Sequence, residues 1–265
     1  MGKIQSTQNS KIKNVQKLFV KSKERKEQNL FVIEGGREIQ LALDRNYSLD
    51  TVFVCPEIFS ETGYAEILSK IRTSNLYEVS LPVFEKVAYR EHSNGILALA
   101  KPKSHALNDL NLPDHPLVIV LEAVEKPGNL GAILRTADAA KVDAVIVCDP
   151  LTDVYNPNVV RSSVGCVFTV PLAIAGFSDV FSFLKEKQIR ILAAELQASQ
   201  WYHDTDFTQA CALIMGTESN GLTDFWIKHA DERIKIPMRG KIDSLNVSVS
   251  TAVLTFEAMR QRGFC

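Results

Sequence analysis

The second half of the chain consists of short apolar runs separated by segments of helical period, and this arrangement constrains the fold more than any other feature. Strands are expected at residues 117–124, 144–149, 189–196, 212–216 and 232–238, and helices at residues 129–140, 178–188, 223–230 and 249–259. Several of these strands are apolar on both faces, which is typical of a parallel sheet covered by helices. The pattern therefore predicts an α/β fold, whose ligands bind at the carboxyl ends of the strands.

The first 100 residues also alternate between helices and strands, on a smaller scale. One face of a helix expected over residues 12–28 carries the apolar side chains of Ile12, Val15, Leu18 and Phe19. Further strands are expected at residues 30–34, 49–55 and 95–100, and further helices at residues 37–46 and 63–75. Residues 101–116 contain three prolines and little periodicity, which is typical of a linker. The sequence thus predicts a smaller α/β or α+β domain over residues 1–100, a linker over 101–116 and a larger domain over 117–265.

Charge is distributed unevenly along a chain whose formal net charge is only −1. Residues 1–30 hold eight lysines and arginines against two glutamates. This excess fits a solvated helix face or a frayed arm, and it fits a patch that binds phosphates equally well. Net charge by itself therefore neither requires nor excludes a nucleic-acid partner.

Five cysteines are scattered along the chain without a C-x-x-C pair, and the five histidines show no metal-ligand spacing. This distribution favours free thiols in a reducing compartment over a disulfide framework or a zinc site, so no metal is expected. No apolar run approaches the roughly 20 residues that cross a bilayer, and the basic N-terminus lacks the apolar core of a signal peptide. A cytoplasmic protein without a membrane partner is expected.

The segment after the first strand of the larger domain reads EKPGNLGAILRTADA, from Glu125 to Ala139. Asn129 stands at the expected start of a helix, where its side chain could cap backbone amides. Arg135 lies six residues further on, in an otherwise small and apolar helix. By itself the segment fits a helix cap with a surface arginine, and it lacks the G-x-G-x-x-G spacing of a dinucleotide-binding loop.

Two later segments also place small and polar residues at strand ends. In LIMGTESNGL, Gly216 is followed two residues later by Glu218, which fits either a loop whose backbone approaches a ligand or a tight turn with a solvated glutamate. In IPMRGKIDSLNVSVSTA, the apolar positions change from an alternating to a helical period near Val249. Close helix packing explains the small residues of this helix, but it does not explain Ser244 and Asn246 just before it.

Together the three segments resemble the three motifs of the SpoU (TrmH) family of RNA 2′-O-ribose methyltransferases, in the SPOUT class. The first motif has an asparagine and an arginine six residues apart, here Asn129 and Arg135. The second has a glycine followed two residues later by glutamate, here Gly216 and Glu218. The third reads I-P-M, a glycine and then S-L-N-V-S-V, which residues 236–249 match. Order and spacing agree over roughly the last 150 residues, and the one departure is TESNG, where relatives commonly have a second glycine after the glutamate.

The resemblance implies a C-terminal α/β-knot domain, in which the chain forms a trefoil knot against the general rule. It implies that S-adenosylmethionine (SAM) lies bent against the knot loops, where Gly216, Ile236 and Leu245 match positions that contact the cofactor. Residues 5–100 are similar, more weakly, to the substrate-binding domain that often precedes this one, a fold related to RNA-binding ribosomal proteins. The implied partners are RNA and a second copy of the chain, in a homodimer, without DNA.

By the same resemblance, Arg135 lies nearest the chemistry and is proposed in relatives to help deprotonate the ribose hydroxyl together with a substrate phosphate. A guanidinium keeps its proton under almost all conditions, so Arg135 could as readily clamp a phosphate and position the ribose. The residues expected to orient Arg135 and the RNA are Asn129, Glu218, Ser244 and Asn246. Ribosomal RNA is the expected substrate because of the N-terminal module and its basic residues, and transfer RNA is the alternative.

Two other classes of protein share parts of this pattern. A non-catalytic RNA-binding protein could keep the same fold, but the intact motif residues argue against it. A nucleotide-dependent oxidoreductase could use a parallel α/β sheet, but the missing glycine fingerprint argues against that class. The sequence therefore favours an enzyme that methylates a ribose 2′-hydroxyl with SAM as cofactor.

Overall fold

The computed structural model describes residues 1–59, 67–88 and 94–264, and the chain forms two compact units. Unit one comprises Met1–Lys103 and Asp153–Thr169, and unit two comprises Ser104–Thr152 and Val170–Cys265. An excursion from the second half of the chain thus belongs to unit one. The assignment of RNA selection to residues 1–100 and of methyl transfer to residues 117–265 stays a prediction.

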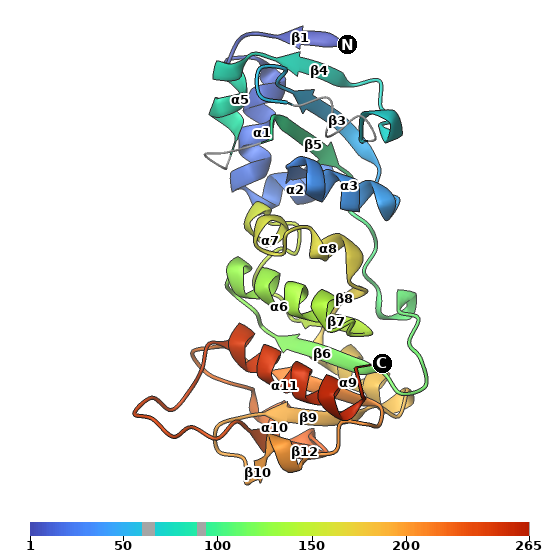
Figure 1. Ribbon diagram of the computed structural model, residues 1–265, viewed down its shortest axis with the longest axis vertical. Helices are drawn as coiled ribbons and strands as arrows, with labels where there is room; N and C mark the ends of the chain where they lie inside the picture. The colour runs from blue at the N-terminus through green and yellow to red at the C-terminus, as the bar shows by residue number, and fades with distance from the viewer. Residues whose placement is uncertain (60–66, 89–93, 265) are drawn as a thin grey trace. The chain divides into compact units, whose positions relative to one another are not determined.

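Unit one contains a mixed five-stranded sheet (Figure 1). Its strands are β1 (Gly2–Ile4), β2 (Phe31–Glu34), β3 (Leu49–Val54), β4 (Leu76–Val79) and β5 (Ile96–Ala100), in the order β1-β4-β3-β5-β2. Strand β4 runs parallel to β1 and β3, whereas β5 runs antiparallel to β2 and β3. The three predicted strands are confirmed. The sequence missed β1 and β4 because runs of three and four residues are too short to establish a period.

The helices of unit one are α1 (Ser10–Val20), α2 (Ser22–Gln28), α3 (Gly36–Asp44), α5 (Leu81–Val87), α7 (Pro157–Ser162) and α8 (Cys166–Thr169). Helix α1 buries Ile12, Val15 and Leu18, as the apolar period predicted. The prediction of one continuous helix over residues 12–28 is wrong, because Lys21 has extended backbone angles and separates α1 from α2. The helix predicted over residues 63–75 lies partly outside the described residues. Residues 67–70 are helical as predicted, but the prediction is wrong for residues 71–75, which are not helical.

Arg25, one of the eight basic residues near the N-terminus, is buried within unit one. Its side chain is 4% exposed; Nε donates a hydrogen bond to Asp153 Oδ2 over 2.7 Å, and Nη1 donates to the carbonyl oxygen of Leu18 over 2.7 Å. Removing one partner of such a buried pair leaves the other charge without compensation, which is strongly destabilising. The interpretation of these basic residues as a solvated face or a phosphate-binding patch is therefore wrong for Arg25.

The excursion of unit one is held by aromatic side chains. Tyr155 stacks on Phe31 with ring centroids 4.1 Å apart, and Phe168 lies edge-on to Tyr47 at 5.0 Å. The hydroxyls of Tyr47 and Tyr155 are hydrogen-bonded at 3.2 Å. Because all four rings are buried, they combine a large apolar area with a satisfied polar contact and tie the excursion to the first hundred residues.

Unit two contains a seven-stranded sheet in which every pairing is parallel. Its strands are β6 (Leu117–Glu122), β7 (Ala144–Cys148), β8 (Leu172–Ala175), β9 (Arg190–Ala194), β10 (Gln200–Trp201), β11 (Cys211–Met215) and β12 (Glu232–Lys235), in the order β10-β12-β9-β11-β6-β7-β8. Every residue of β6, β7 and β11 is buried, which confirms the prediction of a parallel sheet covered by helices. The sequence missed the short strands β8 and β10, and the strand predicted to reach Met238 ends at Lys235.

The helices of unit two are α6 (Pro127–Ala139), α9 (Phe177–Glu186), α10 (Asp224–His229) and α11 (Val247–Gln261), with single turns at η1 (Leu107–Asp109) and η2 (Tyr202–Asp204). Helices α6 and α11 lie side by side (Figure 1). Leu107, Leu110 and Leu112, from the segment predicted to be a linker, pack on the core of this unit. None of the helices in the described parts of the chain has the length and apolarity needed to span a bilayer.

The strand order reverses between β6 and β11. From β6 the chain continues outward through β7 and β8, and the later strands β9 to β12 lie on the other side of β6. In open parallel sheets such a switch point leaves a crevice outside the carboxyl ends of the strands, where ligands bind. This edge of unit two is therefore the place to look for a site.

Candidate active site

The switch point brings two loops together at the carboxyl ends of β6 and β11. The two strands pair in parallel, so that Leu121 lies opposite Met215. The loop after β6 leads into α6, and the loop after β11 turns back on itself before α10. Residues about ninety positions apart in the sequence thereby become neighbours.

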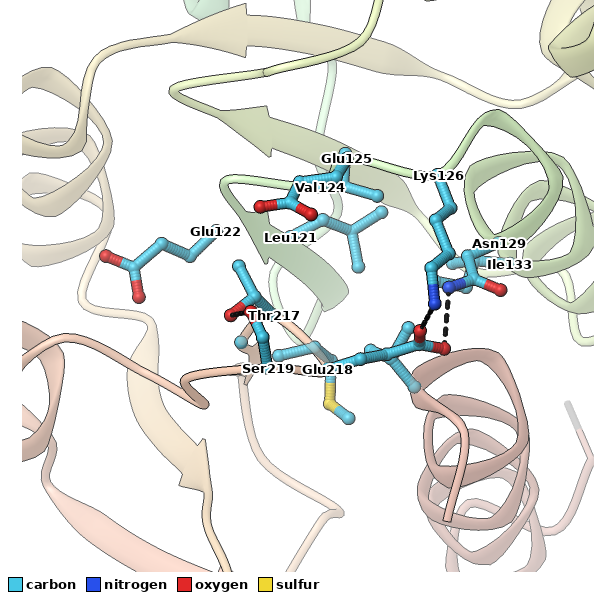
Figure 2. A pocket seen from close by; sticks show the side chains of 13 residues that line it. Leu121, Glu122, Val124, Glu125, Lys126, Asn129, Ile133, Thr217, Glu218 and Ser219 are labelled. Carbon is cyan, nitrogen blue, oxygen red and sulfur yellow. Dashed lines mark hydrogen bonds and ion pairs between the residues drawn. The ribbon is translucent and has the colours of Figure 1, made fainter. Parts of the chain in front are cut away.

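Four polar side chains meet at this edge, and we call them the Glu218 cluster: Lys126, Asn129, Glu218 and Asn246. Asn129 Nδ2 donates a hydrogen bond to Glu218 Oε1 over 2.8 Å. Asn246 Nδ2 donates to the same carboxylate oxygen, and also to Asn129 Oδ1 over 3.2 Å. Lys126 Nζ pairs with the other oxygen, Oε2. Figure 2 shows the side chains of Lys126 and Asn129 pointing toward Glu218.

Helix α11 fixes the orientation of the Asn246 amide. Asn246 is the N-cap of this helix, and its Oδ1 accepts hydrogen bonds from Ser248 N over 2.9 Å and from Ser248 Oγ over 2.6 Å. Because the oxygen is engaged in capping, the amide nitrogen is turned toward Glu218. The change of period near Val249 therefore marks the start of a helix whose cap is also part of the site.

Glu218 is held in its ionised form. The ammonium of Lys126 and then the amide of Asn129 lower the pKa of its carboxyl below the ordinary value. The side chain is 24% exposed, so water screens part of these interactions. A carboxylate with both oxygens occupied and a lowered pKa is a poor base, but it holds two amide groups in a defined orientation.

A cavity of about 110 Å³ opens beside the cluster (Figure 2). Its charged lining residues are Glu122, Glu125, Lys126 and Glu218. Glu122 is engaged elsewhere, because its two oxygens accept hydrogen bonds from Thr223 N over 2.9 Å and Thr223 Oγ1 over 2.7 Å. Lys126 is thus the one cation among the described residues that line this cavity. In the same described ranges, no group of three or more His, Cys, Asp or Glu residues is placed to hold a metal ion.

A larger cavity, of about 570 Å³, lies against the other side of the loop after β11. Its wall includes Gly216, Ile236 and Leu245, the three residues expected to contact a cofactor. Ser244 lines it too, and its hydroxyl donates to Asp243 Oδ1 over 3.1 Å. The structure therefore gathers these four predicted residues at one cavity, but leaves Ser244 outside the hydrogen bonds of the Glu218 cluster.

Gly216 is required by the way this loop folds back. Thr217 and Gly221 exchange two backbone hydrogen bonds of 3.0 Å. A Cβ on Gly216 would lie 2.2 Å from the carbonyl carbon of Gly221 and 2.4 Å from Leu222 N, so no side chain fits. Because of this closeness, the loop presents backbone rather than side chain to both cavities at Gly216.

Arg135 is the predicted site residue that neither lines a cavity nor belongs to the Glu218 cluster. It is exposed on α6, and no hydrogen bond or ion pair joins it to another described residue. Six residues of helix correspond to a rise of about 9 Å and a rotation of about 240°, so Arg135 and Asn129 point to different sides of α6. Within one chain, Arg135 therefore stands apart from the Glu218 cluster.

The predicted capping role of Asn129 is wrong. Helix α6 begins at Pro127 with Lys126 as its N-cap, which makes Asn129 the third helical residue. Proline suits the first position because its missing N–H has no partner there in any helix. Sequence reasoning also missed Lys126. The signal that could have found it is the K-P pair, because proline favours the first position of a helix and so places Lys126 at the start of α6.

A parallel α/β sheet with a ligand-sized cavity and an ionised polar cluster at its switch point defines the class of this protein: an α/β protein with a site for a small molecule. Residues 116–256 match the family described as the SpoU rRNA Methylase family, and residues 9–98 match the MRM3-like substrate binding domain. The chain belongs to the SpoU rRNA methylase family.

Individual relatives match nearly the whole chain. The 23S rRNA (guanosine(2553)-2′-O)-methyltransferase RlmP of Bacillus subtilis is 30% identical over 97% of this chain and 98% of its own length. A crystal structure of an RNA 2′-O ribose methyltransferase is 36% identical and covers 98% of this chain and 99% of its own, with a TM-score of 0.86. An AdoMet-bound rRNA methyltransferase from Sinorhizobium meliloti is 28% identical, covers 97% of each chain and has a TM-score of 0.88.

Family membership confirms the resemblance drawn from the three sequence motifs. It also confirms the predicted fold: an α/β unit with a mixed sheet, and a knotted C-terminal unit built on an all-parallel sheet. The roles of the individual site residues stay predictions.

Proposed function

We propose that this protein transfers a methyl group from SAM to the ribose 2′-hydroxyl of a guanosine in 23S ribosomal RNA. The support from relatives is the B. subtilis enzyme, which is named for that reaction and matches across nearly the whole of both chains. The observation within the chain that carries the proposal is the Glu218 cluster beside a cavity of about 570 Å³. Transfer RNA is the alternative substrate.

The larger cavity suits the cofactor in size and lining. Its volume lies in the range of about 300–1,000 Å³ that is typical of sites for small organic molecules. Ile236 and Leu245 offer apolar contacts, and the loop at Gly216 offers backbone groups at close approach. These three residues would hold SAM. When bound, it supplies an electrophilic methyl group on a sulfonium, chemistry that needs no metal.

Within this proposal the Glu218 cluster orients the RNA rather than removing its proton. Glu218 is a poor base because its pKa is lowered and Lys126 and two amides occupy its oxygens. Its carboxylate instead fixes Asn129, which lines the small cavity, and Asn246, which directly precedes the lining residue Val247. Both amides are thereby held where they could contact the target nucleotide. Correct alignment of a hydroxyl with the methyl group is itself a large part of such a rate enhancement.

Arg135 needs a different geometry, and a homodimer supplies one. Helix α11 exposes Val249 by 47% and Phe256 by 43%, and the half-buried Ala252 and Val253 lie on the same face of the helix. Arg135 is exposed on α6, which packs beside α11. We infer that two copies associate through this α11 face, which would place Arg135 at the interface, where it can clamp a substrate phosphate.

Methylation of natural RNA tests the proposed function. The protein should transfer labelled methyl groups from SAM to 23S ribosomal RNA from cells that lack the protein, and mass spectrometry of the digested RNA should find 2′-O-methylguanosine. Methylation of transfer RNA alone would replace the substrate. RNA binding without any methyl transfer would show a non-catalytic protein. A cytoplasmic location is part of the proposal, in keeping with Cys55, Cys148 and Cys211, which form no disulfide.

A further inference from the structure

Glu195 is a carboxylate in the wall of the larger cavity that neither the motifs nor the mechanism uses. It follows β9 directly, and β9 lies between β11 and β12 in the sheet. Its side chain is only 11% exposed. Oε1 is fully buried and accepts no hydrogen bond from any residue in the described parts of the chain.

The surroundings hold Glu195 in place without satisfying it. Its backbone N–H donates to the carbonyl oxygen of Ile234 over 3.0 Å, which fixes the residue at the end of the sheet. Arg233 Nη1 approaches Oε1 to 3.3 Å and balances the charge, but this contact is not a hydrogen bond. A buried acceptor without a donor is costly, and native structures satisfy nearly all such groups. Oε1 is thus held by the charge of Arg233 alone, and the part of the carboxylate that lines the cavity is left for a ligand to reach.

The local charges select the kind of donor. Arg233 already balances the charge of Glu195, and Lys235 lines the same cavity with its ammonium over the Trp201 ring. A further cation beside Glu195 would therefore meet a carboxylate that already has its counter-charge. A neutral pair of hydroxyls adds no further charge and can donate to the part of the carboxylate that lines the cavity. Acidic side chains near the carboxyl edge of parallel sheets bind nucleotide ribose in this way.

We propose that Glu195 binds the ribose hydroxyls of the cofactor. This inference rests on the proposed function, because it takes the larger cavity to be the SAM site. It assigns the cofactor's ribose to the end of β9, on the opposite side of the β11 loop from the small cavity, and adds a side-chain contact to the backbone and apolar contacts of Gly216, Ile236 and Leu245.

Isothermal calorimetry on Glu195→Gln tests the contact without any need for turnover. The probes are S-adenosylhomocysteine, 5′-methylthioadenosine, which lacks the amino-acid part, and a 2′,3′-dideoxy form of the latter. The variant should weaken the first two probes by the same factor, about 10- to 100-fold, the range for a hydrogen bond to a charged group. The dideoxy probe should bind both proteins equally. Glu186→Gln, which removes an exposed carboxylate from α9, is the matched control and should change nothing.

Each result that differs from this expectation contradicts either the ribose contact, the role of Glu195 or the proposed function. If Glu195→Gln weakens S-adenosylhomocysteine but not 5′-methylthioadenosine, the carboxylate binds the amino-acid ammonium and not the ribose. If the variant weakens the dideoxy probe equally, the partner is the adenine amino group. Unchanged affinities, with an unchanged melting temperature to show correct folding, would remove Glu195 from the site. If the unaltered protein binds none of the probes, the proposed function itself fails.

Discussion

Asn246 joins two tasks that can be separated by substitution. Its side-chain oxygen caps α11, and its amide nitrogen donates to Glu218 and Asn129. Asn246→Ala removes both contributions. Asn246→Ser keeps an oxygen that can cap the helix, because serine ranks beside asparagine at this position, but it removes the amide donors.

The structure sets the size of each effect. Loss of an N-cap costs about 1 kcal/mol, which lowers the melting temperature of a domain of this size by about 2–4 °C. Asn246→Ala should show this loss, whereas Asn246→Ser should melt close to the unaltered protein. Both variants leave Glu218 without one of its donors, and we expect methyl transfer to fall about 100-fold in each, a typical cost of misplaced reacting groups.

The assay pairs thermal unfolding with methyl transfer at saturating RNA and SAM. Asn9 is the matched control, since it caps α1 of unit one by accepting a hydrogen bond from Lys11 N over 2.9 Å. Asn9→Ala should lower the melting temperature by a similar amount without lowering kcat. Near-normal turnover in Asn246→Ser would refute the reasoning, because it would show that the amide donors are dispensable and that Asn246 is only a helix cap.

Four further predictions concern other parts of the site. Gly216→Ala should lower both melting temperature and cofactor affinity, because its Cβ would lie 2.2 Å from the backbone of the same loop; unchanged calorimetry would disprove that crowding. Lys126→Met should raise the pKa of Glu218, because Lys126 is the largest cause of its lowering. The acid limb of the pH–rate profile should then move to higher pH, and Lys126→Arg should restore it. An unmoved limb would show that the rate does not depend on the ionisation of Glu218. Arg135→Ala should reduce methyl transfer about 10²–10⁴-fold, with melting temperature and cofactor affinity unchanged. Arg135→Lys should be nearly as inactive, because lysine lacks the planar guanidinium that can hold a phosphate with two hydrogen bonds. Near-normal turnover in the alanine variant would exclude Arg135 from the mechanism. If the proposed homodimer forms through α11, Phe256→Glu should give monomers in light scattering, and a monomeric unaltered protein would contradict the proposed interface.

The sequence by itself determined the parallel sheet of unit two, its main helices and the residues that belong to the family motifs. These features are local or periodic: a strand buried on both faces reads as a continuous apolar run, and a motif is a fixed spacing of residue types. The family resemblance proposed Asn129, Glu218, Ser244 and Asn246 as the residues that orient Arg135 and the RNA, and the structure brings three of them together while it leaves Ser244 and Arg135 apart. The contact between these three side chains depends on the pairing of β6 with β11. A family motif can imply that pairing, but the hydrophobic period of each segment cannot.

The tertiary structure alone decided which side chains are buried, paired or left without a donor. Nothing local distinguishes Arg25 from its basic neighbours, yet it is buried against Asp153, 128 residues away in the sequence. The same holds for residues 153–169, where the rings of Tyr155 and Phe168 are buried against Phe31 and Tyr47. Deleting the first hundred residues would expose those two rings. Glu195 looks like one more glutamate in the sequence, and only the register of β9 between its neighbours makes it a buried acceptor in a cavity. Burial and charge compensation are properties of contacts between distant segments, so no pattern along the chain records them.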